Sequence, residues 1–176
     1  MKVFFRDVFF IIVTALIISL LLQTVVQKSD VNGSSMEPSL HNEQIILISK
    51  ANYHFNEPER GDIITLHPPS PFSPRAVPFI KRIIALPGDI IEISNGKVFL
   101  NGTELEEPYI AEPPGYNIRA TQIPDGEYFV LGDNRNNSND SHTGWTLPRE
   151  NIIGKAWLSI WPPLEWGLIP NYSSPE

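Results

Sequence analysis

The feature that most constrains the fold of this chain is an apolar run near its N-terminus. In a chain of 176 residues, positions 8–27 carry no charged side chain, and Lys2 and Arg6 precede them. At about 1.5 Å per residue, a helix of that length reaches roughly the 30 Å of a bilayer's hydrocarbon core. Such a helix is apolar on every face, which is not typical of a helix packed in a soluble core. The run therefore predicts a membrane-spanning anchor.

A cleaved signal peptide is the alternative interpretation of this run. Such a peptide has a shorter apolar core and a small-x-small cleavage site. Here the residues that follow the leucines read "QTVVQKSD", which offers no such site. We therefore expect residues 1–27 to form a short cytoplasmic stub and a transmembrane helix. Because basic residues favour the cytoplasmic side, residues 28–176 should form an extracytoplasmic domain.

The rest of the chain has the pattern of short strands joined by turns. The sequence contains 17 prolines and 11 glycines, and the runs between them are rich in β-branched and aromatic residues. Asn95-Gly96 suits the two-residue turn of a hairpin. Residues 67–78 and 106–126 are expected to form long loops. We predict a mostly-β fold, with a coiled antiparallel sheet system in a single domain.

The composition argues against several classes of function. The formal net charge is -7 and no cluster of Lys or Arg is present, so nucleic acid is not an expected partner. A chain without cysteine has no disulfide, thiol nucleophile or cysteine-ligated metal. The four histidines lack the spacing of metal ligands, and we expect no metal and no other cofactor. Glu106 and Glu107 are expected to be solvated in a loop.

Three polar stretches remain as candidates for chemistry, and Lys81 is their most informative residue. The stretches read "GSSMEPSL", "FIKRIIALPGD" and "GDNRNNSNDSHTGW". On a half-buried strand, Lys81 and Arg82 face opposite sides, so one of them should point inward or both should lie at an edge. A buried lysine has a lowered pKa and can accept a proton from a serine hydroxyl. Alternatively, Lys81 extends to solvent beside Arg82.

These stretches, together with "GDIITLH" between the first two, resemble the four sequence boxes of the type I signal peptidases. The resemblance extends from the apolar run to about Trp161. It implies a membrane-anchored serine endopeptidase that removes signal peptides from exported preproteins with a Ser-Lys dyad. Reticulum-type signal peptidases would have a histidine in place of Lys81, and repressor-type Ser-Lys proteases carry a DNA-binding segment. The alternative function is a non-catalytic, membrane-tethered β-domain that acts as a binding module.

The resemblance implies a role for each residue that matches a family motif. Ser35 matches the nucleophile, Lys81 the general base, and Ser138 the hydroxyl that orients the lysine amine. Gly33 stands where some relatives have a serine that donates to the oxyanion, so the backbone N–H groups of Ser35 and Gly33 would serve here. The expected supporting polar cluster consists of Asp133, Asn134, Arg135 and Asp140. In many members an arginine pairs with the last of these, and His142 takes its place.

The resemblance also implies a substrate with small residues, typically Ala-x-Ala, before the cut. This signal peptide would bind as an added strand. The residues expected to contact it are Ser29, Val31, Phe79 and Ile80. Membrane lipid is the second expected partner, in a bacterial plasma membrane or in a thylakoid. Three tryptophans near the C-terminus either contact the membrane interface or pack in the core: Trp157, Trp161 and Trp166.

Overall fold

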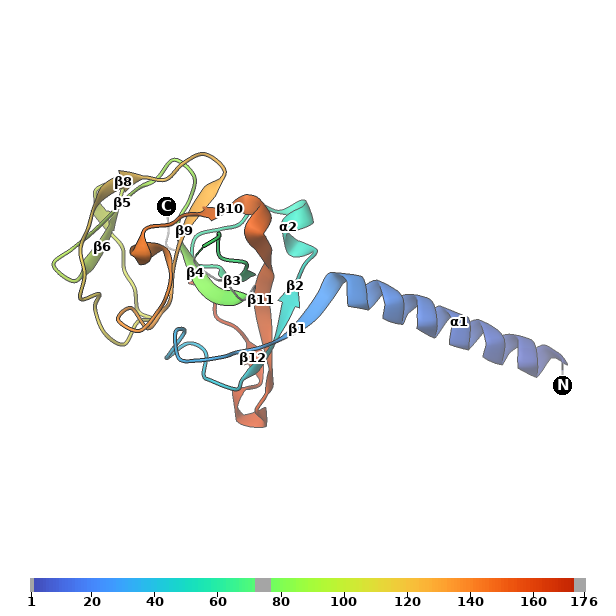
Figure 1. Ribbon diagram of the computed structural model, residues 1–176. Coiled ribbons are helices and arrows are strands. Elements are labelled where there is room, and N and C mark those ends of the chain that lie inside the picture. The colour runs from blue at the N-terminus through green and yellow to red at the C-terminus, as the bar shows by residue number, and fades with distance from the viewer. Residues whose placement is uncertain (1, 72–76, 173–176) are drawn as a thin grey trace.

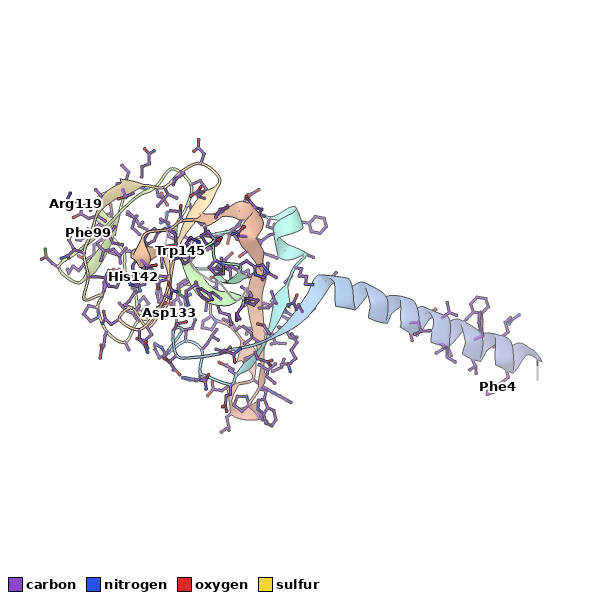
Figure 2. All side chains as sticks on the ribbon, in the orientation of Figure 1. Phe4, Phe99, Arg119, Asp133, His142 and Trp145 are labelled. Atoms are coloured by element: carbon purple, nitrogen blue, oxygen red, sulfur yellow. The ribbon has the colours of Figure 1, made fainter. Side chains whose placement is uncertain are left out.

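The computed structural model describes residues 2–71 and 77–172 of the chain. A long N-terminal helix projects away from a body built of two antiparallel β-sheets (Figure 1). Phe4 lies on the helix at one end of the molecule, and Phe99 and Arg119 lie on the smaller sheet at the other (Figure 2). The prediction of a mostly-β, antiparallel fold is confirmed.

The N-terminal helix α1 spans Lys2–Val25. Val26 and Gln27, which we expected inside the anchor, already belong to strand β1. Among the residues that the structure describes, no helix combines the length and hydropathy needed to cross a membrane. The anchor inferred from the sequence is therefore not confirmed and stays a prediction.

The main sheet has eight strands and carries most of the core. Its order is β1-β2-β11-β3-β4-β9-β10, with β12 paired to β11, and every pairing is antiparallel. The strands are β1 (Val26–Asp30), β2 (Ile45–Ser49), β3 (Ile63–Leu66), β4 (Phe79–Ala85), β9 (Glu127–Leu131), β10 (Leu147–Pro148), β11 (Ile152–Trp161) and β12 (Gly167–Leu168).

The smaller sheet has the order β7-β6-β5-β8. Its strands are β5 (Ile90–Ser94), β6 (Lys97–Leu100), β7 (Thr103–Glu104) and β8 (Ile118–Gln122). Asn95 and Gly96 join β5 to β6 with φ angles of 53° and 75°, as a two-residue hairpin turn requires. The predicted hairpin is confirmed. Short helical turns complete the body: α2 (Asn52–Phe55), η1 (Ser141–Thr143), η2 (Arg149–Asn151) and η3 (Pro163–Glu165).

Apolar clusters cover both faces of the main sheet, and this corrects the expectation for β4. Successive residues of β3, Ile63 and Ile64, belong to different clusters. On β4, Lys81 is 3% exposed and Arg82 is fully buried, whereas alternation led us to expect one inward side chain or an edge strand. The reason is that β4 lies inside the sheet, between β3 and β9, with neither face open to solvent.

The tryptophans near the C-terminus do not pack in the core. Trp161 is 52% exposed and Trp166 is 66% exposed, and Trp157 is also exposed. They share the segment of β11, η3 and β12 with two further exposed apolar side chains, Leu164 and Leu168. This part of the molecule therefore presents apolar surface to its surroundings.

Candidate active site

Ser35 and Lys81, which are far apart in the sequence, meet in the structure. The Lys81 Nζ donates a hydrogen bond of 2.7 Å to the Ser35 Oγ and a second one of 2.9 Å to the Ile80 carbonyl oxygen. Ser35 lies in the loop between β1 and β2, and Lys81 lies on β4. The contact predicted for this pair is therefore present. The alternative in which Lys81 extends to solvent is wrong, because its side chain is buried.

Burial also changes the acidity of the amine. It lowers the pKa of Lys81 from 10.5 to about 8, because the charged form loses its hydration. The carboxylates of Asp140 and Asp133 act in the opposite direction and favour the protonated amine. Loss of hydration is the larger effect, so a substantial fraction of this lysine is neutral in mildly alkaline solution. A neutral amine that contacts a hydroxyl can act as its general base.

The residues that follow β9, from Gly132 to Asn137, hold in place the loop that carries Ser34 and Ser35, which we call the serine loop. The Asn134 backbone N–H donates to the Ser35 carbonyl oxygen at 3.1 Å, and the Asn134 side-chain amide donates to the Ser34 carbonyl oxygen at the same distance. Asn137 adds a 3.0 Å bond to the Ser34 hydroxyl. Gly132 permits this approach, because a Cβ there would collide with the Ser35 carbonyl and the Ser138 hydroxyl. The close packing fixes the serine loop against this segment.

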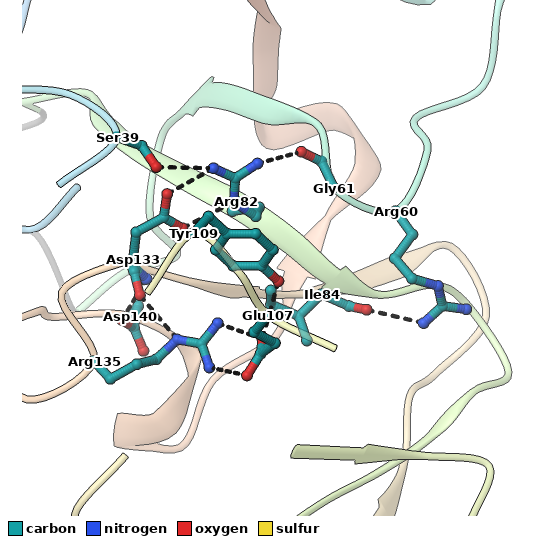
Figure 3. A network of polar contacts seen from close by, with 11 residues as sticks. Ser39, Arg60, Gly61, Arg82, Ile84, Glu107, Tyr109, Asp133, Arg135 and Asp140 are labelled. Atoms are coloured by element: carbon teal, nitrogen blue, oxygen red, sulfur yellow. Dashed lines mark hydrogen bonds and ion pairs between the residues drawn. The ribbon is translucent and has the colours of Figure 1, made fainter. Parts of the chain in front are cut away.

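A buried ion pair joins the same segment to β4 (Figure 3). Arg82 donates to both carboxylate oxygens of Asp133, at 2.8 and 2.6 Å, and both side chains have no exposed surface. The Arg82 guanidinium also donates to the Gly61 carbonyl at 2.8 Å and to the Ser39 hydroxyl at 3.3 Å. Because Lys81 precedes Arg82, this pair links the strand of the lysine to the segment that holds the serine loop.

Arg135 belongs to a second buried ion pair, and its partner corrects an expectation. Its guanidinium donates to both oxygens of Glu107, at 2.6 and 2.5 Å. The Glu107 side chain is only 5% exposed, so the interpretation of Glu107 as a solvated residue is wrong. Glu107 is buried because a charged guanidinium from the other segment compensates its charge. Tyr109 donates to Glu107 and lies over the Arg82 guanidinium at 4.1 Å (Figure 3).

Asp140 and Ser138 lie in the interior beside this network. One Asp140 oxygen accepts the Gly132 N–H at 2.8 Å, and the other lies 2.7 Å from Nδ1 of His142, whose ring stacks on Tyr116. His142 therefore occupies the position of the expected ion-pair partner. The Ser138 hydroxyl is buried and has no hydrogen-bond partner among the described residues. Its orienting bond to the lysine amine stays a prediction.

The two predicted oxyanion donors differ in the structure. The Gly33 N–H donates to the Asn42 side-chain oxygen at 2.7 Å, which corrects its assignment, since this bond already uses the only proton on that nitrogen. Within the described part of the chain, no group accepts a hydrogen bond from the Ser35 N–H. Of the two predicted donors, the Ser35 N–H is therefore the one without an acceptor among the described residues.

A cleft of about 210 Å³ opens beside the serine and the lysine. It contains three of the four residues that we expected to contact a peptide, namely Val31, Phe79 and Ile80. Ser29 does not line it and instead pairs with Ile46 between β1 and β2. The other lining residues are Asp30, Asn32, Ser35, Met36, Val77, Pro78, Lys81 and Asn139. Across the described residues, no group of three or more acidic or histidine side chains is placed to hold a metal ion.

Comparison with known proteins identifies the family. Residues 5–161 match the family described as "Signal peptidase, peptidase S26". The chain belongs to this signal peptidase family. The resemblance seen in the sequence boxes is thereby confirmed, and the chain is a serine endopeptidase of the signal peptidase type.

Named relatives come from bacteria and from a plant. The probable signal peptidase I-1 of Synechocystis sp. is 43% identical over 93% of this chain and 86% of its own length. Signal peptidase I S of Bacillus subtilis is 34% identical over 86% of each chain. The chloroplastic thylakoidal processing peptidase 1 of Arabidopsis thaliana is 37% identical over 85% of this chain and 46% of its own length.

Several residues of the site were not found by sequence reasoning. Asn137 and Asn42 fix the serine loop, and Glu107 and Tyr109 enclose the buried guanidinium groups. The asparagine-rich stretch that includes Asn137 does carry a sequence signal for such a role. An asparagine side chain can both donate and accept hydrogen bonds, so it can hold a loop in place. Glu107 and Tyr109 had no such signal, because their partners lie in distant segments.

We predict that Asp133→Ala destabilises the fold strongly. The substitution leaves the Arg82 charge buried without its partner, which should lower the free energy of unfolding by about 3–5 kcal/mol. Urea unfolding followed by circular dichroism measures the change. Asp125→Ala, in an exposed turn, is the control and should change the free energy by about 0.5 kcal/mol or less. A similar small change for Asp133→Ala would contradict the structural role of the pair.

Proposed function

We propose that this signal peptidase cleaves preproteins with a catalytic dyad of Ser35 and Lys81. The observation that carries the proposal is the 2.7 Å contact between the serine hydroxyl and a buried lysine amine. The amine has a lowered pKa and lines the same cleft as the serine, and such a perturbed group in a cleft is typical of a functional site.

The reaction would proceed in two halves. In the first, the neutral Lys81 amine takes the hydroxyl proton as the Ser35 Oγ attacks the scissile carbonyl carbon. The resulting ammonium then protonates the leaving amine, so that the peptide C–N bond breaks and an acyl-enzyme ester remains. In the second half, the amine takes a proton from water, which attacks the ester and releases the signal peptide with a free carboxylate. Ser35 regains its proton from Lys81.

The oxyanion of each tetrahedral intermediate would be stabilised by the Ser35 backbone N–H. A donor of this kind contributes about 3 kcal/mol to transition-state stabilisation where its removal has been measured. The bonds from Asn134 and Asn137 to the adjoining backbone and hydroxyl keep the N–H oriented before the substrate arrives. Ser138 would orient the lysine amine once the ammonium forms, since its hydroxyl has no other described partner.

The substrate would bind as an extended strand in the cleft. β1 lies at one edge of the main sheet, and the β4 residues from Phe79 to Lys81 precede the stretch that pairs with β9. Both segments line the cleft with backbone that a peptide can pair with. The apolar walls provided by Val31 and Ile80 suit small apolar side chains, which supports the proposed Ala-x-Ala preference.

We also propose that α1 anchors the enzyme in a membrane. Its 24 residues match the length of a span, and several of its apolar side chains, such as Phe9 and Ile11, are exposed. The catalytic body would then lie on the extracytoplasmic side of a bacterial plasma membrane, or on the lumenal side of a thylakoid. The exposed Trp161 and Trp166 support contact with the lipid interface, where tryptophan is enriched.

The proposed dyad predicts that Ser35→Ala and Lys81→Ala each abolish cleavage. The full chain in detergent is incubated with a preprotein that has Ala-x-Ala before the cut, and the products are followed by gel electrophoresis and mass spectrometry. The same preprotein with bulky residues at the two alanine positions serves as the matched control and should stay intact. Retained cleavage by folded Lys81→Ala would exclude the dyad. Cleavage of both preproteins by the intact enzyme would contradict the Ala-x-Ala preference.

The lowered pKa of Lys81 predicts how activity depends on pH. The base is the neutral amine, so kcat/KM should be low below the pKa and should rise as the pH passes through about 8. Initial rates measured between pH 6 and pH 10 test this, with circular dichroism at each pH to show that the fold persists. A rate that is already maximal at pH 6 would mean that Lys81 is not the group whose deprotonation activates the serine.

The proposed anchor predicts that the full chain stays in membranes after extraction with alkaline carbonate. Removal of residues 2–25 should release the body into the soluble fraction, or leave it bound only through its exposed tryptophans. In sealed membrane vesicles, protease added on the side opposite the N-terminus should digest the catalytic body. A full chain that carbonate extracts completely is inconsistent with a membrane-spanning α1.

A further inference from the structure

The last described residues of the chain return to the body beside the active site. The Ile169 N–H donates to the Trp157 carbonyl at 3.0 Å. The Ile169 side chain packs against the apolar cluster that contains Met36 and Ile80, both of which line the substrate cleft. These contacts hold the start of a segment, residues 169–172, which we call the C-terminal segment. Of the two residues at its end, Tyr172 lies over the buried guanidinium of Arg82, and Asn171 binds Asp62.

Asn171 binds the residue that immediately precedes β3, the strand that pairs with Arg82. Its side-chain amide donates a 2.7 Å hydrogen bond to Asp62, a carboxylate that also accepts from Tyr53 at 2.6 Å and pairs with Lys155 at 2.5 Å. Asp62 is fully buried. It directly follows Gly61, whose carbonyl oxygen accepts one of the Arg82 N–H groups. Asn171 therefore holds the backbone stretch that binds Arg82 on one side.

Tyr172 covers Arg82 from another side. Its ring lies 5.4 Å from the Arg82 guanidinium carbon and 5.3 Å from the centroid of Tyr109, which itself lies 4.1 Å from that carbon. Tyr172 is 38% exposed, whereas Arg82 and Asp133 have no exposed surface. The Tyr172 ring is therefore part of the layer that separates the Arg82–Asp133 pair from solvent. A cation over an aromatic face is also attracted to it, most strongly when desolvated.

This cover matters because a buried ion pair depends on the exclusion of water. The attraction between two charges falls steeply as the effective dielectric constant rises. The Arg82–Asp133 pair connects two parts of the proposed dyad, since Lys81 adjoins Arg82 and Asn134, next to Asp133, binds the Ser35 carbonyl. Water admitted beside Arg82 would weaken this ion pair. The distance between the Lys81 amine and the Ser35 hydroxyl would then be less closely fixed.

We propose that Asn171 and Tyr172 are positioning residues for the dyad, and that docking of the C-terminal segment over the Arg82–Asp133 pair sets the geometry between Ser35 and Lys81. The inference rests on the proposed dyad and adds to it a dependence on residues close to the end of the chain. Neither Asn171 nor Tyr172 lines the cleft. These two side chains would therefore act on the chemical step and leave the binding of the peptide unchanged.

The test measures kcat and KM of preprotein cleavage for variants of the full chain in detergent. Tyr172→Ala should lower kcat roughly tenfold, within the range expected for losing an aromatic contact of a desolvated cation, with KM within about twofold of the unchanged enzyme. Tyr172→Phe retains the ring and should retain kcat. Asn171→Ala should lower kcat several-fold. Phe55→Ala removes an aromatic ring that is 86% exposed, and it should leave both constants unchanged.

Thermal melting by circular dichroism accompanies each assay, and rates are compared at a temperature where every variant is fully folded. If Tyr172→Ala does not fold, Tyr172→Leu replaces it, since leucine keeps apolar bulk without the aromatic face. A loss of kcat that persists in the folded variant and is absent in Tyr172→Phe supports the inference. A loss that disappears on cooling, or an equal loss in Tyr172→Phe, overturns it.

The outcome for Ser35 separates this inference from the proposed function. Full kcat in Tyr172→Ala together with an inactive Ser35→Ala overturns the positioning role and leaves the dyad standing. Unchanged cleavage by Ser35→Ala overturns the dyad itself, and the positioning role with it.

Discussion

The burial of two neighbouring cations on one strand is the constraint on which the rest of this structure depends. Lys81 and Arg82 are both removed from water, and each must find a different solution. Arg82 stays charged and is compensated by a two-point ion pair with Asp133. No carboxylate among the described residues contacts Lys81 directly, and burial lowers its pKa instead. The same strand thus carries a charge held by an ion pair and an amine of lowered pKa, which the proposed dyad would use as its base.

The different roles of Arg82 and Lys81 follow from the chemistry of their side chains. A guanidinium remains protonated under almost all conditions and offers several donors in a fixed plane, which suits it to hold Asp133, Gly61 and Ser39 together. An ammonium loses its proton readily when desolvated. Exchanging the order of these residues would place the permanent charge beside Ser35, where the proposed dyad requires a proton acceptor. The order of Lys81 and Arg82 therefore determines which side chain lies beside Ser35 and which one pairs with Asp133.

Local patterns predicted most of the strands and the hairpin, and the sequence boxes predicted which serine and lysine would meet. The expectation of a loop over residues 106–126 was wrong in part, because β8 lies within it and pairs with β5. The Asn95-Gly96 turn and the strand around Lys81 depend on neighbours in the sequence, so their signals are short-range. The joint burial of Lys81 and Arg82 was not predictable from alternation, since that pattern assumes one solvated face. The Glu107–Arg135 pair joins residues 28 positions apart, and Glu107 lies in a stretch that reads as a polar loop. Such pairs depend on tertiary packing, which no local window records.

The junction between α1 and β1 has a consequence for where a substrate is cut. Helix α1 ends at Val25 and strand β1 begins at the next residue, so the two elements are continuous and no linker separates them. The residues of the cleft wall, Asp30 and Val31, follow after five and six residues of largely extended chain, or about 15–20 Å. If α1 is held in a bilayer, this short stretch fixes the height of the cleft above the lipid. The scissile bond would be selected by its height above the lipid as well as by its side chains, and a preprotein whose apolar segment ended at another depth would present the wrong peptide bond to Ser35.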